Sequence, residues 1–172
     1  KANRAAVTAA DVRKALGEWR YRSNLIEEET QQPIADGTIK IEVEGEVVGQ
    51  INGLTVIEYG EYQFGHPSRI SARIYVGRSG VTVIEREVHL SGRIHNKGVL
   101  TLEGYLHGQY AAKEPLSLAA SLSFEQNYSV FEVDSASSTE LYVLLSALAD
   151  LPIKQGIAVT GSVDQQGRVQ PV

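Results

Sequence analysis

Residues 134–149 read DSASSTELYVLLSALA, and this stretch decides the fold. A polar start gives way at Thr139 to apolar residues that recur with the helical period. The face that this period places towards a core carries Leu141, Leu144, Leu145 and Leu148. The pattern predicts a helix over residues 139–149. Pro152 prevents it from continuing, because proline lacks the N–H that a helix interior needs.

Ser135 lies where irregular backbone is expected to give way to this helix. Free backbone N–H groups and the positive end of the helix dipole meet there, so the serine is a candidate nucleophile for attack on a carbonyl. The local sequence alone favours a plainer interpretation, a helix N-cap that stabilises the fold by about 1 kcal/mol. No base is evident nearby, because all four histidines lie far upstream.

Composition limits the class of protein. A chain of 172 residues with 42% apolar content suffices for one main domain. The net charge of −5 and the scattered Lys and Arg residues disfavour nucleic acid as a partner. The chain has no Cys, which suits a reducing compartment, so we expect a cytoplasmic location. No histidine pair has the spacing of metal ligands, so we expect no metal. No cofactor is expected in this chain. No apolar run is long enough to span a membrane, so no membrane partner is expected.

A helical lead-in is predicted at the N-terminus. Thr8 and Asp11 form a capping-box pattern, and apolar residues at helical spacing continue to about Glu29. Pro33 and Gly37 then predict a boundary, which gives a lead-in over residues 1–36 and a main domain over residues 37–172. Because Met is absent even at position 1, we expect the chain to be part of a longer protein.

The main domain begins with period-two alternation. It predicts strands at 38–43 and 47–57 forming a hairpin, and further strands at 69–76 and 81–85.

The second half mixes helices and strands. Residues 98–110 suit either a helix or extended structure, and we favour the helix, while residues 95–98 suit a polar turn better than a substrate-facing feature. A strand is predicted at 117–124, another at 156–160, and a third from Arg168. The fold class is therefore α/β (α+β), with mixed β-sheets and helices.

Five segments, in order along the chain, resemble the proteolytic domain of Lon, the AAA+ serine protease with a Ser-Lys dyad, over roughly residues 38–172. They are VGQINGL at 48–54, LSGRIHNKGVL at 90–100, DSAS at 134–137, VTGS at 159–162 and GRVQPV at 167–172. The DSAS form is similar to the archaeal-type and related Lon-like branches. The resemblance implies a ribosomal protein S5 domain 2-like fold, and the lead-in resembles the end of the helical subdomain of an ATPase module.

The resemblance also implies roles for site residues. Ser135 matches the nucleophile, and the matching lysine would fall about six residues beyond the C-terminus, so the chain as given is expected to be catalytically silent. Thr160 matches the threonine that holds the lysine amine. Glu132 and Asp134 match acidic positions that can pair with the lysine, and the N–H groups of Ser135 and Ala136 would form the oxyanion hole.

Lys154 is not expected to replace the missing base. It follows Pro152 in a polar turn, where water would keep its amine charged, whereas a base needs a neutral amine.

The family implies an endopeptidase that degrades unfolded or damaged proteins, a homohexameric ring, and an upstream ATPase that uses ATP and Mg. Some Lon-like branches work without ATP, so both options stay open. The alternative is a non-catalytic Lon-like domain that assembles a ring and contacts DNA in a motor protein. A self-processing Ser-Lys protease outside Lon is a third option, although such proteases lack the segment around residues 92–98.

Overall fold

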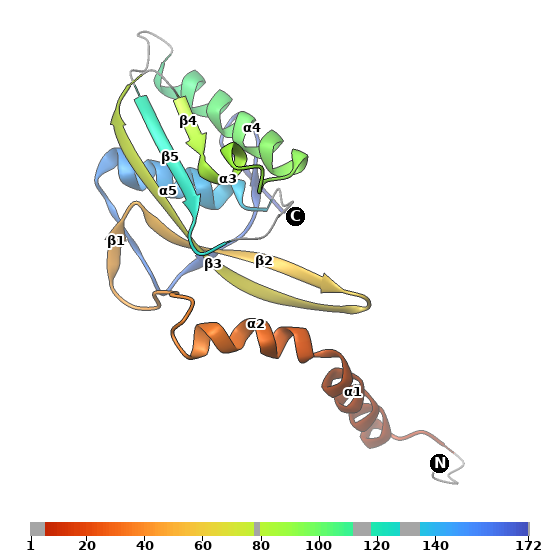
Figure 1. The fold of residues 1–172 in the computed structure, drawn as a ribbon. Helices are drawn as coiled ribbons and strands as arrows, with labels where there is room; N and C mark the ends of the chain where they lie inside the picture. Colours follow the sequence, from red (N-terminus) through yellow and green to blue (C-terminus); the bar gives the residue numbers. More distant parts are fainter. Residues whose placement is uncertain (1–5, 78–79, 112–117, 128–134, 172) are drawn as a thin grey trace. The chain divides into compact units, whose positions relative to one another are not determined.

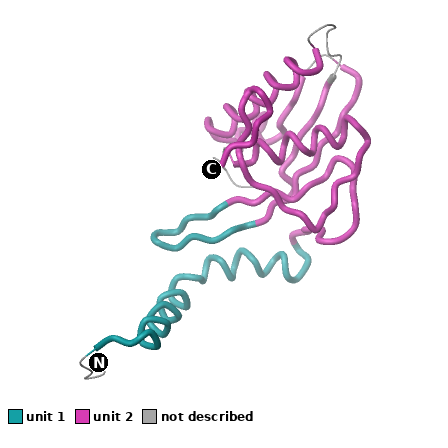
Figure 2. The backbone as a smooth tube through the Cα atoms, turned by 180° about the vertical axis from the view of Figure 1, so that it is seen from behind, with its two compact units in different colours: residues 1–38, 56–66 teal, residues 39–55, 67–172 magenta. Residues whose placement is uncertain are grey.

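The computed structural model describes residues 6–77, 80–111, 118–127 and 135–171. The chain divides into two compact units, which Figure 2 distinguishes by colour. The first unit comprises residues 1–38 and 56–66, and the second comprises residues 39–55 and 67–172.

The first unit contains two helices, α1 (Ala9–Ser23) and α2 (Leu25–Ala35). The predicted capping box is confirmed: the Thr8 hydroxyl accepts from the N–H of Asp11, and the Asp11 carboxylate accepts from the N–H of Thr8. The prediction of one helix that ends before Pro33 is wrong. The helix breaks at Asn24, and α2 continues two residues past Pro33 to Ala35, since an interior proline weakens a helix without always ending it.

The second unit is built on a mixed five-stranded sheet with the order β4-β5-β3-β2-β7 (Figure 1). β3 pairs with β5 in antiparallel fashion, whereas β4 runs parallel to β5 and β7 runs parallel to β2. The strands are β2 (Gln50–Tyr59), β3 (Tyr62–Val76), β4 (Gly80–Val83), β5 (Leu118–Phe124) and β7 (Ala158–Val159), and the tips of β2 and β3 belong to the first unit.

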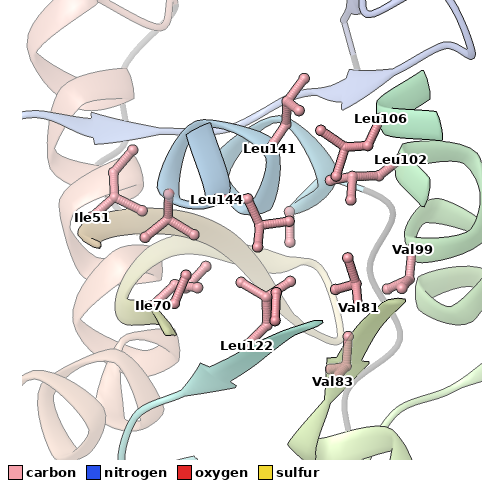
Figure 3. Packing of buried hydrophobic residues seen from close by; sticks show 14 of the residues in the cluster. Ile51, Ile70, Val81, Val83, Val99, Leu102, Leu106, Leu122, Leu141 and Leu144 are labelled. Atoms are coloured by element: carbon pink, nitrogen blue, oxygen red, sulfur yellow. The ribbon is translucent and has the colours of Figure 1, made fainter. Parts of the chain in front are cut away.

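Two helices, α4 (Arg93–Tyr110) and α5 (Ser137–Ala149), cover one face of this sheet. Side chains alternate along β3, so Ile70 and Ala72 are buried while Arg73 is exposed. Figure 3 shows the buried side chains of the strands meeting those of both helices in one core. Its aliphatic members include Ile51, Ile70, Val83, Val99, Leu102, Leu106, Leu122, Leu141 and Leu144.

Two short ladders and a helical turn complete the second unit. β1 (Glu46–Val48) pairs with β6 (Pro152–Lys154), and β8 (Ser162–Val163) pairs with β9 (Val169–Gln170), both antiparallel. The short helix α3 (Ile84–Glu87) follows β4 directly. None of the described helices has the length and apolar character that crossing a membrane requires.

Several predicted elements are confirmed, among them the helix over 139–149 and the strand over 117–124. The predicted hairpin of 38–43 with 47–57 is wrong, because β1 pairs with β6 and residues 38–43 form no strand. The amide of Asn52 donates instead to the carbonyl of Glu42 at 2.7 Å, so a side chain supplies the bond that a strand partner would make.

The polar turn predicted at residues 95–98 is also corrected. These residues lie in the first two turns of α4, and His95 among them is buried with 1% exposure, so the polar sequence here belongs to a helix rather than to a turn. Likewise, residues 152–154 form β6 where a turn was expected.

Candidate active site

Ser135 lies two residues before α5 and is half-buried. Ala136, the residue at the helix cap, is buried with 3% exposure and makes no side-chain capping bond. Its carbonyl accepts the N–H of Glu140 at 2.9 Å, so the helical hydrogen bonds begin directly after Ser135. Of the other predicted site residues, Glu132 and Asp134 lie outside the described residues.

A second segment, residues 159–163, runs beside the start of α5 and is hydrogen-bonded to it by backbone groups. The N–H of Gly161 donates to the carbonyl of Ser135 at 2.8 Å, and the carbonyl of Gly161 accepts the N–H of Ser138 at 3.0 Å. Both backbone groups of Gly161 therefore bond to the start of α5, one to Ser135 just before the helix and one to Ser138 in its first turn. Thr160, which is exposed, is held one residue from this contact.

Side chains of α5 add two further bonds to the 159–163 segment. The hydroxyl of Thr139 donates to the carbonyl of Val159 at 3.0 Å, and the hydroxyl of Ser137 accepts the N–H of Val163 at 3.1 Å. Because these hydroxyls bond to the neighbouring segment, the polar run at the start of the helix fixes the segment that carries Thr160. The segments that carry Ser135 and Thr160 are thus hydrogen-bonded to each other, although the two residues lie 25 positions apart in sequence.

Gly161 has a conformation that only glycine adopts easily, with φ of +139°. A Cβ atom there would lie 3.2 Å from Val169 Cγ1 and 3.4 Å from both Gln170 O and Ser138 Oγ. The glycine of the VTGS motif is therefore explained by its contacts: it allows the segment to approach the helix closely.

The glycines of the VGQINGL motif serve the same helix. A Cβ atom at Gly53 would lie 3.0 Å from Ile70 Cδ1 and 3.4 Å from Thr139 Cγ2, so β2 passes close to the first turn of α5. The N–H of Gly49, between β1 and β2, donates to the hydroxyl of Ser146 at 3.0 Å, near the other end of the helix. Both motif glycines thus adjoin α5.

The backbone donors at the start of α5 are suited to stabilise negative charge. One of them is already used, because the N–H of Ser138 is bonded to Gly161. An oxyanion would therefore have to use donors that precede Ser138, which agrees with the N–H groups of Ser135 and Ala136 that the sequence predicts for this role. Their part in catalysis stays a prediction.

The described lysines do not have the environment of a general base. Lys14, Lys40, Lys97 and Lys154 are all exposed. Apolar surroundings are what favour a neutral amine, and water removes that effect. Lys154 lies in β6, opposite Glu46, as a surface residue of the small ladder.

The histidines have different environments. His89 and His107 are exposed, and burial lowers the pKa of His66 in the first unit. His95 is buried, and its Nε2 lies 2.7 Å from Oε1 of Glu140 in the first turn of α5. The sequence does not reveal this pair, because its partners lie 45 residues apart and no local pattern indicates that Glu140 is buried.

Comparison with known proteins identifies relatives of this chain. No family model matches the chain. A Lon protease homolog of Escherichia coli (strain K12) is 47% identical over 159 residues, which cover 91% of this chain and 27% of that protein. A Lon protease homolog of Haemophilus influenzae is 41% identical over 169 residues, covering 97% of this chain and 28% of that protein.

More distant relatives carry the same family name. The archaeal Lon protease of Methanocaldococcus jannaschii is 32% identical over 132 residues, which cover 71% of this chain and 19% of that protein. The chain thus spans little more than a quarter of the length of its bacterial relatives. The chain is a Lon protease-like domain.

Proposed function

We propose that the chain is the peptidase domain of a Lon-like serine endopeptidase, with Ser135 as the nucleophile of a Ser-Lys dyad. The observation that carries this proposal is the pair of bonds from Gly161 to Ser135 and Ser138. They hold the residue next to Thr160 against the start of α5, which is the arrangement that a serine and its supporting threonine need. The lysine is proposed to follow Val172.

The proposed reaction has two halves. Ser135 Oγ attacks the carbonyl carbon of a peptide bond while its proton passes to the neutral lysine amine, and the carbonyl oxygen becomes an oxyanion. The C–N bond then breaks, the leaving amine takes the proton from the lysine, and an acyl-enzyme remains. Water attacks the ester with the lysine again as base, which releases the acid and restores Ser135.

Supporting roles are assigned to neighbours of Ser135. Thr160 is proposed to accept a hydrogen bond from the lysine amine and so direct it towards Ser135. The backbone N–H groups of Ser135 and Ala136 are proposed to stabilise the oxyanion, at about 3 to 4 kcal/mol per donor. Glu132 and Asp134 are proposed to pair with the lysine and keep the site idle until it rearranges.

The larger protein is proposed to act on unfolded or damaged polypeptides, as part of protein quality control. We infer that it forms a homohexameric ring in the cytoplasm and that an upstream AAA+ module supplies substrate using ATP and Mg. The names of the relatives support the protease family, and the remaining features rest on the resemblance.

The test uses a protein that contains this chain together with the residues that follow Val172. We expect it to hydrolyse unfolded casein and to be labelled by a peptide boronate. Ser135→Ala should abolish both while unfolding remains cooperative. Ser146→Ala is the matched control, because Ser146 lies in the same helix but bonds to Gly49 and to the carbonyl of Leu151.

Ser146→Ala should weaken the fold and leave labelling in the folded protein. Loss of activity in neither variant would show that another residue is the nucleophile. A lysine-containing protein with neither hydrolysis nor labelling would contradict the protease proposal and favour the non-catalytic ring-assembly domain.

A further inference from the structure

His95 and Glu140 form a completely buried polar pair inside the second unit. Their side chains are 1% and 0% exposed, and His95 Nε2 lies 2.7 Å from Glu140 Oε1. The other carboxylate oxygen of Glu140 is buried and has no hydrogen-bond partner among the described residues. His95 is therefore the group that compensates this carboxylate in the described part of the chain.

The pair joins α4 to the start of α5, the helix that follows Ser135. His95 lies in the first turn of α4, and Glu140 lies in the first turn of α5, five residues after Ser135. The ring of His95 also packs edge-on against Phe124, with centroids 5.5 Å apart and planes at 77°. Phe124 is the last residue of β5, so His95 contacts both β5 and α5.

Stability alone does not account for such a pair. Two polar groups lose their water on burial, and well-packed apolar side chains of similar size often give an equally stable protein. A hydrogen bond differs from apolar packing because it fixes distance and direction. Whichever partner carries the proton, the Nε2 to Oε1 contact sets how the first turn of α5 is rotated relative to α4.

We propose that His95 and Glu140 are positioning residues that fix the orientation of Ser135 through the first turn of α5. The proposal rests on the function proposed above. Because Glu140 N–H bonds to the carbonyl of Ala136, a rotation of Glu140 is transmitted directly to the backbone beside the nucleophile. A displacement of about 1 Å at a nucleophile can reduce the rate about 100-fold.

The experiment replaces both partners at once, in the longer protein that includes the residues after Val172. The double variant His95→Leu/Glu140→Leu removes the directional bond but leaves no unpaired buried charge. We expect it to fold with a melting temperature near that of the wild type. Its kcat should fall about 10- to 100-fold, with KM changed less than about threefold, because chemistry rather than substrate binding is affected.

Labelling of Ser135 by the boronate should slow in the same proportion. Leu106→Ala is the control for core damage, since Leu106 lies in the core at the far end of α4 from His95. It should lower the melting temperature and leave kcat of the folded enzyme unchanged. A folded double variant with wild-type kcat would show that the pair is only structural and would overturn the proposal.

A second comparison applies if the leucine pair does not fold. In His95→Gln the amide nitrogen reaches about the place of Nε2, whereas in His95→Asn it falls short. We expect the Gln variant to keep at least about tenfold more activity than the Asn variant. Equal kcat in these two variants would also overturn the proposal. If the wild type itself shows no Ser135-dependent turnover, the proposed function fails instead, so the two failures are distinguishable.

Discussion

Helices α1 and α5 begin in opposite ways. α1 begins with a side-chain capping box between Thr8 and Asp11, and none of its residues is buried. α5 has no side-chain cap, yet its first four residues are all buried polar residues. Hydroxyl and N–H groups of these residues bond to residues 159–163, and the carboxyl group of Glu140 bonds to His95. One helix start is fixed by neighbours in sequence and the other by neighbours in space.

The difference indicates where a site can be precise. A local cap tolerates small movements, because its donor and acceptor belong to one turn of chain. The start of α5 is held by three separate parts of the second unit, β2 at Gly53, α4 at His95 and the 159–163 segment. Such a position is defined in three dimensions, which a nucleophile requires.

Alanine at Gly161 should break the α5 arrangement and gives the largest effect expected. Its φ of +139° is strained for any residue with a Cβ atom, and that atom would meet Val169 and Gln170. We expect Gly161→Ala to lower the free energy of unfolding by about 1–3 kcal/mol, as measured by urea denaturation. Boronate labelling of Ser135 in the longer protein should fall as well.

Gly17→Ala in α1 is the matched substitution with the opposite sign. Gly17 is helical, and nothing lies within 4 Å of the Cβ atom that alanine would add. The change should stabilise α1 by about 0.5–1 kcal/mol, because alanine loses less backbone entropy in a helix. If both substitutions stabilised the protein, the close packing of Gly161 against α5 would be contradicted.

The same contrast explains what the sequence could reveal. Thr8, Asp11 and the leucines of α5 form patterns within one turn or one helix, so the cap and the helix were predictable. The helix start marks Ser135 as a candidate nucleophile, but local chemistry alone favours a cap, so its assignment as nucleophile and the role of Thr160 depend on the family resemblance. The His95–Glu140 pair was not predictable, because His and Glu are usually exposed and only the fold shows that both are buried here.

The strand errors have a related cause. Residues 38–43 alternate as a strand would, but pairing is decided by partners elsewhere in the chain. β1 pairs with residues 152–154. Because Pro152 cannot donate a backbone hydrogen bond, the sequence predicts a turn there rather than a strand. Asn52, which bonds to the carbonyls of Glu42 and Gln155, holds the intervening chain in place without a strand.

Removing the local cap should affect only α1. Thr8→Ala deletes the acceptor for the N–H of Asp11, and we expect a loss of about 1 kcal/mol of helix stability. Amide hydrogen exchange in residues 9–12 measures it.

The reciprocal change, Ala136→Ser, should gain no stability, since Ala136 is buried and the start of α5 already has its bonds. Slower exchange throughout α5 in that variant would contradict this view.

The smallest effect concerns the turn that follows the 159–163 segment, and it separates local from tertiary bonding by pH. Hydrogen bonds from the backbone N–H of Arg168, and then of Gln166, hold the pKa of Asp164 below its usual value. The ionised carboxylate therefore stabilises the turn above the unfolded pKa of 3.8, and this contribution is lost as the pH falls through the lower native pKa. Amide NMR shifts of Gln166 and Arg168 should follow this titration, and Asp164→Asn should abolish it.

The amide of Gly161 should not respond, because its bond to Ser135 involves no carboxyl group. A Gly161 shift that titrates together with Arg168 would mean that the turn and the start of α5 are one cooperative element, and that the contrast between local and tertiary fixing does not hold in this part of the fold.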